Sequence, residues 1–219
     1  MRILTAKDIP ITGFAGIRER VFIQDRSYFS HLVPDECWDG FGPLVYLADA
    51  WFNPNKSTGL HHHSNVDIVS VLPRGSMYHA GSIGDGKTIT AGQAQIQRSG
   101  SGQFSHNEIN PNNSPQPFVQ IWLTPGAQEA PSYEIMDLNP DGTSVVIQRE
   151  QFELGVGLWH TPQQWQGEQE GLLYLISGEG TLTLKDGTST TLQAGSLVKA
   201  AHMHFAAEQA QFFYATHNL

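Results

Sequence analysis

Short runs of alternating apolar and polar residues dominate this chain, and turn residues separate them. Successive side chains of a β-strand point to opposite faces, so such runs predict strands with one buried face. Helical periodicity is poor along most of the chain. Turn signals such as Pro73-Arg74-Gly75 and Gly84-Asp85-Gly86 fall between the runs. The predicted strands are Leu44–Ala50, Val66–Leu72, Ser76–Ser82, Gln93–Arg98, Phe118–Leu123, Ser144–Gln148, Leu172–Ser177, Gly180–Leu184 and Gln211–Thr216.

One hairpin pattern occurs twice along the chain. Residues 71–93 and 175–196 both read as strand, glycine, strand, Gly-containing turn, short strand and Ala-Gly. Many short strands in such a repeat favour tandem barrels over one large sandwich. We therefore predict an all-β fold of two tandem jelly-roll β-barrels, in domains 1–126 and 127–219, with a linker around Pro125–Pro131.

Composition indicates an ordinary globular protein. The chain has 219 residues, of which 39% are hydrophobic and 15% charged. No apolar run is long enough for a transmembrane helix, and Met1–Asp8 contains no apolar segment typical of a secretory signal. The single Cys37 cannot form an internal disulfide, which fits a reducing compartment. We expect a cytoplasmic protein with no membrane association.

The charge balance argues against nucleic acid as a direct partner. Twelve Lys and Arg against twenty-one Asp and Glu give a formal charge of −9, and no basic run reverses it locally. An acidic surface repels phosphate backbones. A regulatory role would therefore have to act through a protein partner.

Two pairs of potential metal ligands share the same spacing. His61-x-His63 and His106-x-Glu108 are both i, i+2 pairs, so each can point two ligand atoms to one side of a strand. Each pair alone is expected about 0.5 times by chance in such a composition. His202-x-His204 is an example of such an accidental pair. The cluster could also simply line a wet barrel mouth.

The order and context of the two pairs resemble the cupin superfamily. Its first motif has His-x-His, an acid and a glycine, and the matching residues here are His61, His63, Asp67 and Gly75. Its second motif has a glycine, a Pro-x-Gly turn, a histidine and an asparagine, and the matching residues here are Gly92, Gly100, Gly102, His106 and Asn110. Asn55 replaces the glycine that opens the first motif, and Gly100 replaces the proline of the second.

More closely, the chain resembles the pirin family of bicupins. The family signature is His-x-His at the start of a strand, followed by a Gly-x-Gly loop that leads to His-x-Glu, and the Asp-Gly-Phe-Gly-Pro stretch at 39–43 is also similar. The resemblance covers most of the first 125 residues and, more weakly, the C-terminal part. It implies one iron ion held by His61, His63, His106 and Glu108. Some family members open flavonols such as quercetin with dioxygen, and others are described as transcriptional co-regulators.

Three departures from the pirin pattern bear on the site. His62 stands where a proline is usual, and the loop from Gly102 to His106 is one residue longer than expected. Asp67 is an alternative to Glu108 as the acidic ligand, because single-domain cupins use an acid at that position. No His-x-His precedes the predicted strand Leu172–Ser177 of the C-terminal barrel, so we expect that barrel to be metal-free.

These residues lead to one main hypothesis and two alternatives. The main one is a monomeric dioxygenase with one divalent metal ion. Fe(II) is the expected metal, and Mn, Ni, Cu and Zn are also compatible with the ligands. Its substrates would be a small flavonol-like aromatic molecule and dioxygen, with Glu108 as the catalytic base. The alternatives are a non-enzymatic, redox-responsive iron protein that acts through a protein partner, and a metal-free cupin scaffold.

Several further side chains are assigned roles by strand alternation. His62 should face away from the histidines on either side of it, and His79 should be a solvated or cross-strand group. The pocket wall should draw on apolar residues of the first barrel, and the candidates are Phe41, Val69, Val71, Phe104 and Trp122.

Overall fold

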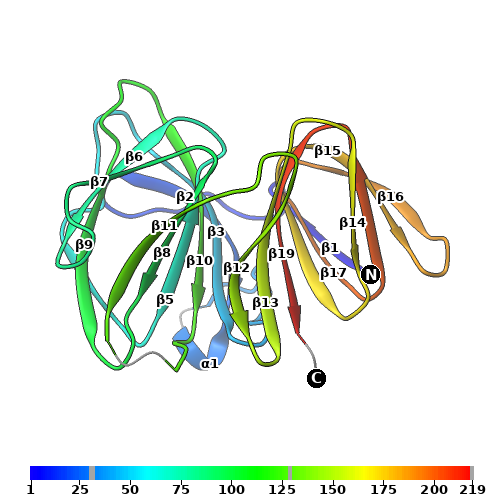
Figure 1. Ribbon diagram of the computed structural model, residues 1–219, viewed down its shortest axis with the longest axis horizontal. Helices are drawn as coiled ribbons and strands as arrows, with labels where there is room; N and C mark the ends of the chain where they lie inside the picture. Colours follow the sequence, from blue (N-terminus) through cyan, green and yellow to red (C-terminus); the bar gives the residue numbers. More distant parts are fainter. Residues whose placement is uncertain (30–32, 128–129, 218–219) are drawn as a thin grey trace. The chain divides into compact units, whose positions relative to one another are not determined.

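The computed structural model describes residues 1–29, 33–127 and 130–217 and is built almost entirely of β-strands (Figure 1). One short helix, α1 (Arg26–Phe29), interrupts them. The predicted all-β fold with two tandem barrel units is confirmed. In the described part of the chain, no helix has the length and apolar character needed to cross a membrane.

The chain forms two compact units. The N-terminal unit is Ile9–Asp137, and the C-terminal unit combines Leu138–Leu219 with Met1–Asp8. This division differs from the predicted boundary at 126/127 because long-range pairing assigns two strands: β1 (Arg2–Thr5) pairs with β17 (Ser196–Ala200), and β11 (Ser132–Asp137) pairs with β8 (Gln93–Arg98). Residues 128–129 of the predicted linker lie outside the described residues.

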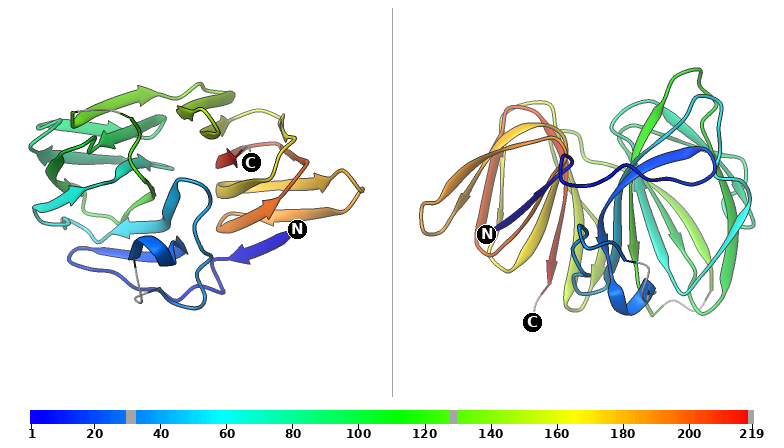
Figure 2. Two further views of the ribbon diagram at one scale, coloured as in Figure 1. Left: turned by 90° about the horizontal axis from the view of Figure 1, so that it is seen from below. Right: turned by 180° about the vertical axis from the view of Figure 1, so that it is seen from behind.

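Two antiparallel sheets make up the N-terminal unit. The six-stranded sheet has the order β11-β8-β5-β10-β3-β2, and the four-stranded sheet has the order β4-β9-β6-β7. The strands not yet delimited are β2 (Ile17–Gln24), β3 (Leu44–Phe52), β4 (His61–Ser64), β5 (Asp67–Val71), β6 (Ser76–Gly81), β7 (Lys87–Thr90), β9 (Gln103–Ile109) and β10 (Gln116–Leu123). Figure 2 shows these strands, coloured blue to green, wrapping around one interior. That interior holds the candidate site.

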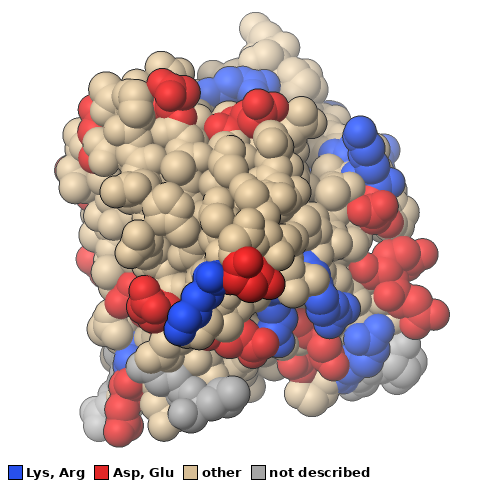
Figure 3. Space-filling model, turned by 90° about the vertical axis from the view of Figure 1, so that its right-hand side faces the viewer, with Lys and Arg blue, Asp and Glu red and all other residues tan. Residues whose placement is uncertain are grey.

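The C-terminal unit repeats the arrangement. Its main sheet runs β1-β17-β15-β19-β13-β12, and β14, β18 and β16 extend from β15 as a second sheet face. Its other strands are β12 (Gly142–Arg149), β13 (Phe152–Trp159), β14 (Gln163–Gly167), β15 (Gly171–Leu184), β16 (Ser189–Gln193), β18 (Met203–Ala207) and β19 (Ala210–His217). On the side that Figure 3 shows, acidic and basic side chains lie next to one another and leave a broad uncharged area.

The single strand β15 replaces two predicted strands, Leu172–Ser177 and Gly180–Leu184. It pairs with β19 and β17 in its first half and with β16 and β18 in its second. A register shift between Leu175 and Ser177, followed by Gly178 at φ 89°, lets the strand bend from one sheet into the other. The glycine that predicted a turn therefore marks a corner within one strand.

Aromatic rings lie over glycines in the core of the C-terminal unit. Gly157 pairs with Phe212 across β13 and β19, and a Cβ at Gly157 would overlap the Phe212 ring. That ring packs against Trp159, with centroids 4.7 Å apart. A larger side chain at position 157 would therefore displace the Phe212 ring, because the surrounding core is buried and closely packed.

We expect Gly157→Val to destabilise the C-terminal unit by about 2 kcal/mol, because the added methyl groups force the Phe212 ring out of its position. Urea unfolding followed by tryptophan fluorescence measures the change. Thr143→Val is the control, since Thr143 pairs with Gly157 on β12 but is exposed. Equal unfolding midpoints for the two variants would contradict the packing argument.

Candidate metal centre

Two paired strands bring three histidines together. β4 pairs with β9 so that His61 lies opposite His106 and His63 lies opposite Phe104. His61 and His63 are half-buried, whereas His62 between them is exposed, as strand alternation predicted. His106 is buried, with only 1% of its surface exposed. The i, i+2 spacing in β4 thus directs two imidazoles toward the buried one in β9.

The three rings form a tight cluster. One potential ligand atom from each histidine lies within 4.8 Å of the others. The Nε2 atoms of His61 and His106 are 3.0 Å apart, and the ring centroids of His63 and His106 are 4.8 Å apart. The Nδ1 atom of His61 lies 2.9 Å from the Gly59 carbonyl oxygen, to which it donates as N–H. That bond leaves the Nε2 lone pair of His61 directed at the cluster.

Burial keeps two of these imidazoles neutral. It is the main cause that lowers the pKa of His63 to about 4 and that of His106 to about 2, and the neighbouring imidazoles act in the same direction. At neutral pH both rings therefore keep a free lone pair, as metal binding requires. Three imidazoles whose potential ligand atoms converge within 4.8 Å fit a divalent first-row metal ion.

Glu108 follows His106 on the same side of β9 and is also buried. Gln95 donates to its Oε1 atom at 2.8 Å, and Gln120 donates to its Oε2 atom at 3.1 Å. Burial raises the pKa of Glu108, and these amide bonds act in the opposite direction. The cluster of three histidines does not include this carboxylate. Its role as fourth ligand therefore stays a prediction.

The alternative acidic ligand lies on another face. Asp67 is paired with Leu123, whereas the inward-facing Ser70 of the same strand lies opposite Gln120. Asp67 and Ser70 are three residues apart, so alternation sends their side chains to opposite faces. The Asp67 carboxylate accepts a hydrogen bond from the Gly126 amide at 3.2 Å. The structure thus places Asp67 outside the histidine cluster.

Sequence reasoning missed a set of interior glutamines. Gln95 and Gln97 on β8 have no exposed surface, although alternating glutamines usually indicate an outward face. Trp122 donates from Nε1 to the Oε1 atom of Gln120 at 2.9 Å, and Tyr133 donates to the Oε1 atom of Gln95 at 3.0 Å. Because an indole N–H can only donate, the amide nitrogen of Gln120 must face Glu108. The i, i+2 spacing of Gln95 and Gln97, which places both side chains on one face of β8, was the feature of the sequence that could have indicated this set.

His79 is the cross-strand partner that was one of its two predicted roles. It is paired with Glu108 across β6 and β9 and is fully buried rather than solvated. Its Nε2 atom lies 3.0 Å from the Gln97 amide oxygen, and its Nδ1 atom lies 3.0 Å from the Gly84 carbonyl oxygen. With both ring nitrogens held in this way, His79 supports the interior rather than joining the cluster.

A cavity of about 240 Å³ opens beside the histidines and has a largely apolar wall. Its lining includes Phe14, Ile17, Glu19, Tyr46, Ala48, Ala50, Thr58, His61, His63, Glu108, Phe118, Gln120 and Trp122. Of the five predicted wall residues only Trp122 is among them. Val69 and Val71 lie on the Asp67 face of β5, and Phe104 packs with Val66 and Ile68, against which Trp122 also packs. This cavity can hold a flat apolar ligand within reach of the histidines.

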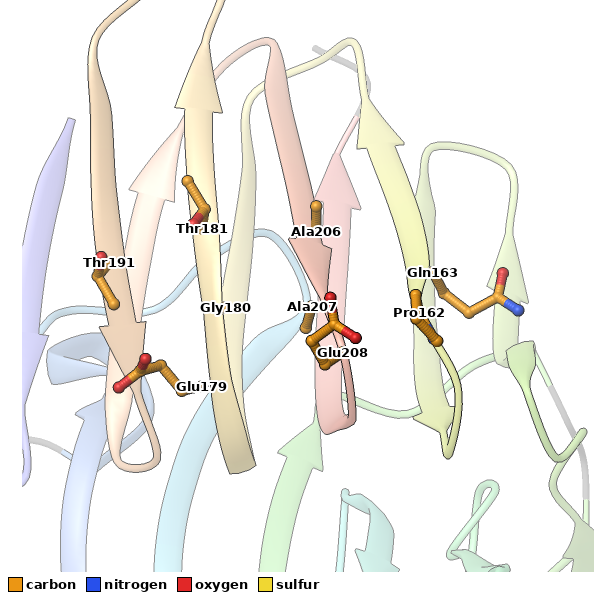
Figure 4. Close-up of a pocket in the computed structure, with 9 residues that line it drawn as sticks. All are labelled: Pro162, Gln163, Glu179, Gly180, Thr181, Thr191, Ala206, Ala207 and Glu208. Atoms are coloured by element: carbon orange, nitrogen blue, oxygen red, sulfur yellow. The ribbon is translucent and has the colours of Figure 1, made fainter.

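The C-terminal unit has a larger and more open hollow of about 380 Å³, shown in Figure 4. Polar and small residues line it, and of its acidic groups Glu179 lies on β15 whereas Glu208 lies in the turn between β18 and β19. Gln193 donates to Glu179 at 3.2 Å. Among the described residues the only cluster of metal-ligating side chains is the one at His61, His63 and His106. The smaller cavity in the N-terminal unit is therefore the better candidate site.

Comparison with known proteins agrees with this geometry. Residues 26–123 match the family model named Pirin. The chain is 30% identical to Quercetin 2,3-dioxygenase of Escherichia coli K12 over 87 residues, which are 39% of this chain and 37% of that protein. It is 28% identical to a Pirin-like protein of Caulobacter vibrioides over 99 residues, which are 45% of this chain and 41% of that protein. The matched stretches thus span less than half the length of either relative.

Solved structures show the same fold over nearly the whole chain. The bacterial pirin YhhW of Escherichia coli, solved in complex with nickel(II), superposes with a TM-score of 0.78 at 17% identity, covering 98% of this chain and 97% of that one. A Quercetin 2,3-dioxygenase of Acinetobacter baumannii gives a TM-score of 0.66 at 13% identity, covering 100% and 86%. At these identities the comparison establishes the fold alone.

Proposed function

Because residues 26–123 match the pirin family model, we propose that this chain is a metal-dependent dioxygenase that cleaves a flavonol-like aromatic substrate with dioxygen. The relatives named as quercetin 2,3-dioxygenases support a dioxygenase-like function of this general class. The flavonol substrate and the ring-opening reaction are the specific part of the proposal.

The observation that carries the proposal is the convergence of three imidazoles, two of which, those of His61 and His63, line an apolar cavity. We propose His61, His63, His106 and Glu108 as the ligands of one metal ion, Fe(II) first, with Mn, Ni, Cu or Zn also compatible. When bound, such an ion supplies Lewis acidity and redox chemistry.

The protein's own side chains would bind and orient the substrate. Phe118 and Trp122 offer flat apolar surfaces in the cavity wall, and small residues at Ala48 and Ala50 leave room for a ring. An enclosed apolar wall excludes water from the reacting atoms. A flavonol fits this description, because it is flat and largely apolar and carries an acidic enol hydroxyl.

Glu108 is the group we assign to proton transfer. Its carboxylate lies on the cavity wall, is buried, and has a raised pKa because burial disfavours its charge. A carboxylate with a raised pKa is a stronger base, so one oxygen of Glu108 can accept the proton of the enol hydroxyl. Gln95 and Gln120 hold the carboxylate in place while it does so.

The proposal is tested by oxygen consumption. We expect the iron-loaded protein, purified without a His tag, to take up oxygen when quercetin is added, at least about tenfold faster than Glu108→Ala. An oxygen electrode measures the rate, and metal analysis before each run gives the iron content by which each rate is divided.

Two results would contradict the proposal. One is the absence of quercetin-dependent uptake in iron-loaded protein, and the other is an equal rate in Glu108→Ala. Stoichiometric iron without uptake would favour the alternative of a redox-responsive protein that acts through a partner.

A further inference from the structure

The cavity has a second polar position, away from the histidines. The histidines come from the four-stranded sheet, whereas Glu19 on β2 and Tyr46 on β3 come from the six-stranded sheet. Both of these side chains line the cavity. The Tyr46 hydroxyl donates a hydrogen bond to the Oε2 atom of Glu19 at 2.7 Å. The cavity therefore carries polar groups on both of its sheets.

Glu19 keeps one oxygen available. Tyr46 occupies Oε2, and Oε1 accepts no hydrogen bond from any residue that the structure describes. None of the residues that line this cavity is Lys or Arg, so no side chain there neutralises the carboxyl. Burial accordingly raises the pKa of Glu19. A ligand that donates a hydrogen bond would therefore stabilise this oxygen more than an apolar ligand would.

The same pair also lines a second cavity. Glu19 and Tyr46 are part of the wall of a neighbouring space of about 190 Å³, together with Ile9, Pro10, Thr12, Val21, Gln24, Pro34 and Cys37. The hydrogen-bonded pair thus stands between two spaces within the N-terminal unit. A ligand bound beside the histidines meets Glu19 where its own cavity ends and the next begins.

We propose that Glu19 is a specificity-determining residue whose Oε1 atom accepts a hydrogen bond from a hydroxyl group of the aromatic ligand. The ligand class is then a hydroxylated ring system that uses one polar end at the histidines and a second hydroxyl at Glu19. This inference rests on the proposed function, since it concerns the substrate of that site.

Glu19 would discriminate between ligands with and without a hydroxyl group because a buried polar oxygen without a hydrogen-bond donor costs free energy. A ring without a hydroxyl would displace water from Glu19 and leave its oxygen without a donor in an apolar wall. Sites that hydrogen-bond a ligand hydroxyl reject the analogue that lacks it far more strongly than apolar sites reject an added hydroxyl. We therefore expect the wild-type protein to bind the hydroxylated ligand at least about tenfold more tightly.

The test compares three flavonols that carry no, one or two hydroxyls on the pendant ring: galangin, kaempferol and quercetin. Their dissociation constants for metal-loaded protein are measured by calorimetry without oxygen, so that binding is separated from turnover. In the wild type we expect kaempferol and quercetin to bind at least about tenfold more tightly than galangin, and Glu19→Leu to reduce this ratio to about one. Glu19→Gln, which keeps the side-chain shape, should reduce the ratio about threefold.

A matched control exists in the other unit. Tyr214 donates to the Oε1 atom of Glu153 at 2.8 Å, which is the same kind of pair on β19 and β13. Glu153→Leu should leave the ratio of dissociation constants unchanged. Thermal melts and metal content of each variant establish that it is folded and loaded.

The outcomes separate this inference from the proposed function. An unchanged ratio in both Glu19 variants, or no measurable binding of any of the three flavonols by the wild type, would overturn the role of Glu19. Selective binding that depends on Glu19, without oxygen uptake, would overturn the dioxygenase proposal and leave the recognition site standing.

Discussion

His106→Ala should abolish metal binding and, with it, oxygen uptake. His106 is the buried member of the cluster, and its ring contacts those of both His61 and His63, at centroid distances of 4.5 and 4.8 Å. Without it, two half-buried imidazoles on β4 are the only histidine ligands left. We expect metal content to fall from about one ion per chain to below about 0.1, and quercetin-dependent uptake to fall about 10³-fold.

The control for this variant is the accidental His-x-His of the other unit. His202 lies near Glu168 and His204 near Gln164, at 3.4 and 3.0 Å, and neither belongs to the cluster of potential ligands. The double variant His202→Ala, His204→Ala should keep full metal content by plasma emission analysis. Comparable metal loss in both variants, or unchanged metal in His106→Ala, would rule out the proposed ligand set.

The sequence was enough to predict the histidine cluster because its information is local. The i, i+2 spacing in β4 fixes a common face for His61 and His63, and one antiparallel pairing with β9 brings His106 opposite. The all-β class was equally accessible, since alternation and turn residues are read within a few positions. Strand ends differed by only a few residues, as at β3 and β10.

Inward and outward faces were harder to predict where both are buried. Every residue of β5 is buried, so alternation gave two apolar faces and no rule to choose between them. Val69 and Val71 were therefore assigned to the cavity, although they share the face of Asp67. Gln95 and Gln97 were assigned to neither face, because their polar character gave no reason to expect the buried positions that their strand provides.

Pairing between distant segments was the other limit. β1 joins β17 across nearly the whole length of the chain, and no local pattern in Arg2–Thr5 indicates this partner. Glu19 went unnoticed for the same reason. Its role depends on Tyr46, on cavity walls from the six-stranded sheet and on histidines from the other sheet, which only the folded unit brings together.

Gln95→Met should lower kcat about 10- to 100-fold while metal content and KM stay within about threefold of the wild type. Gln95 is a positioning residue in this prediction: it donates to Oε1 of Glu108, and Tyr133 fixes the orientation of its amide. Methionine fills a similar volume but cannot donate, so the carboxylate loses one of its two amide partners. Its oxygens then no longer sit at one defined position for proton transfer.

The matched control for Gln95→Met is Gln97→Met on the same strand. Both glutamines are fully buried, but Gln97 contacts His79 and not Glu108. Steady-state kinetics at equal iron content should give a kcat for Gln97→Met within about threefold of the wild-type value. The double variant Gln95→Met, Gln120→Met should have a kcat close to that of Glu108→Ala. Equal losses in the two single variants would mean that core disturbance alone lowers the rate. A loss confined to the glutamines that reach Glu108 would mean that the interior amides hold the catalytic carboxylate.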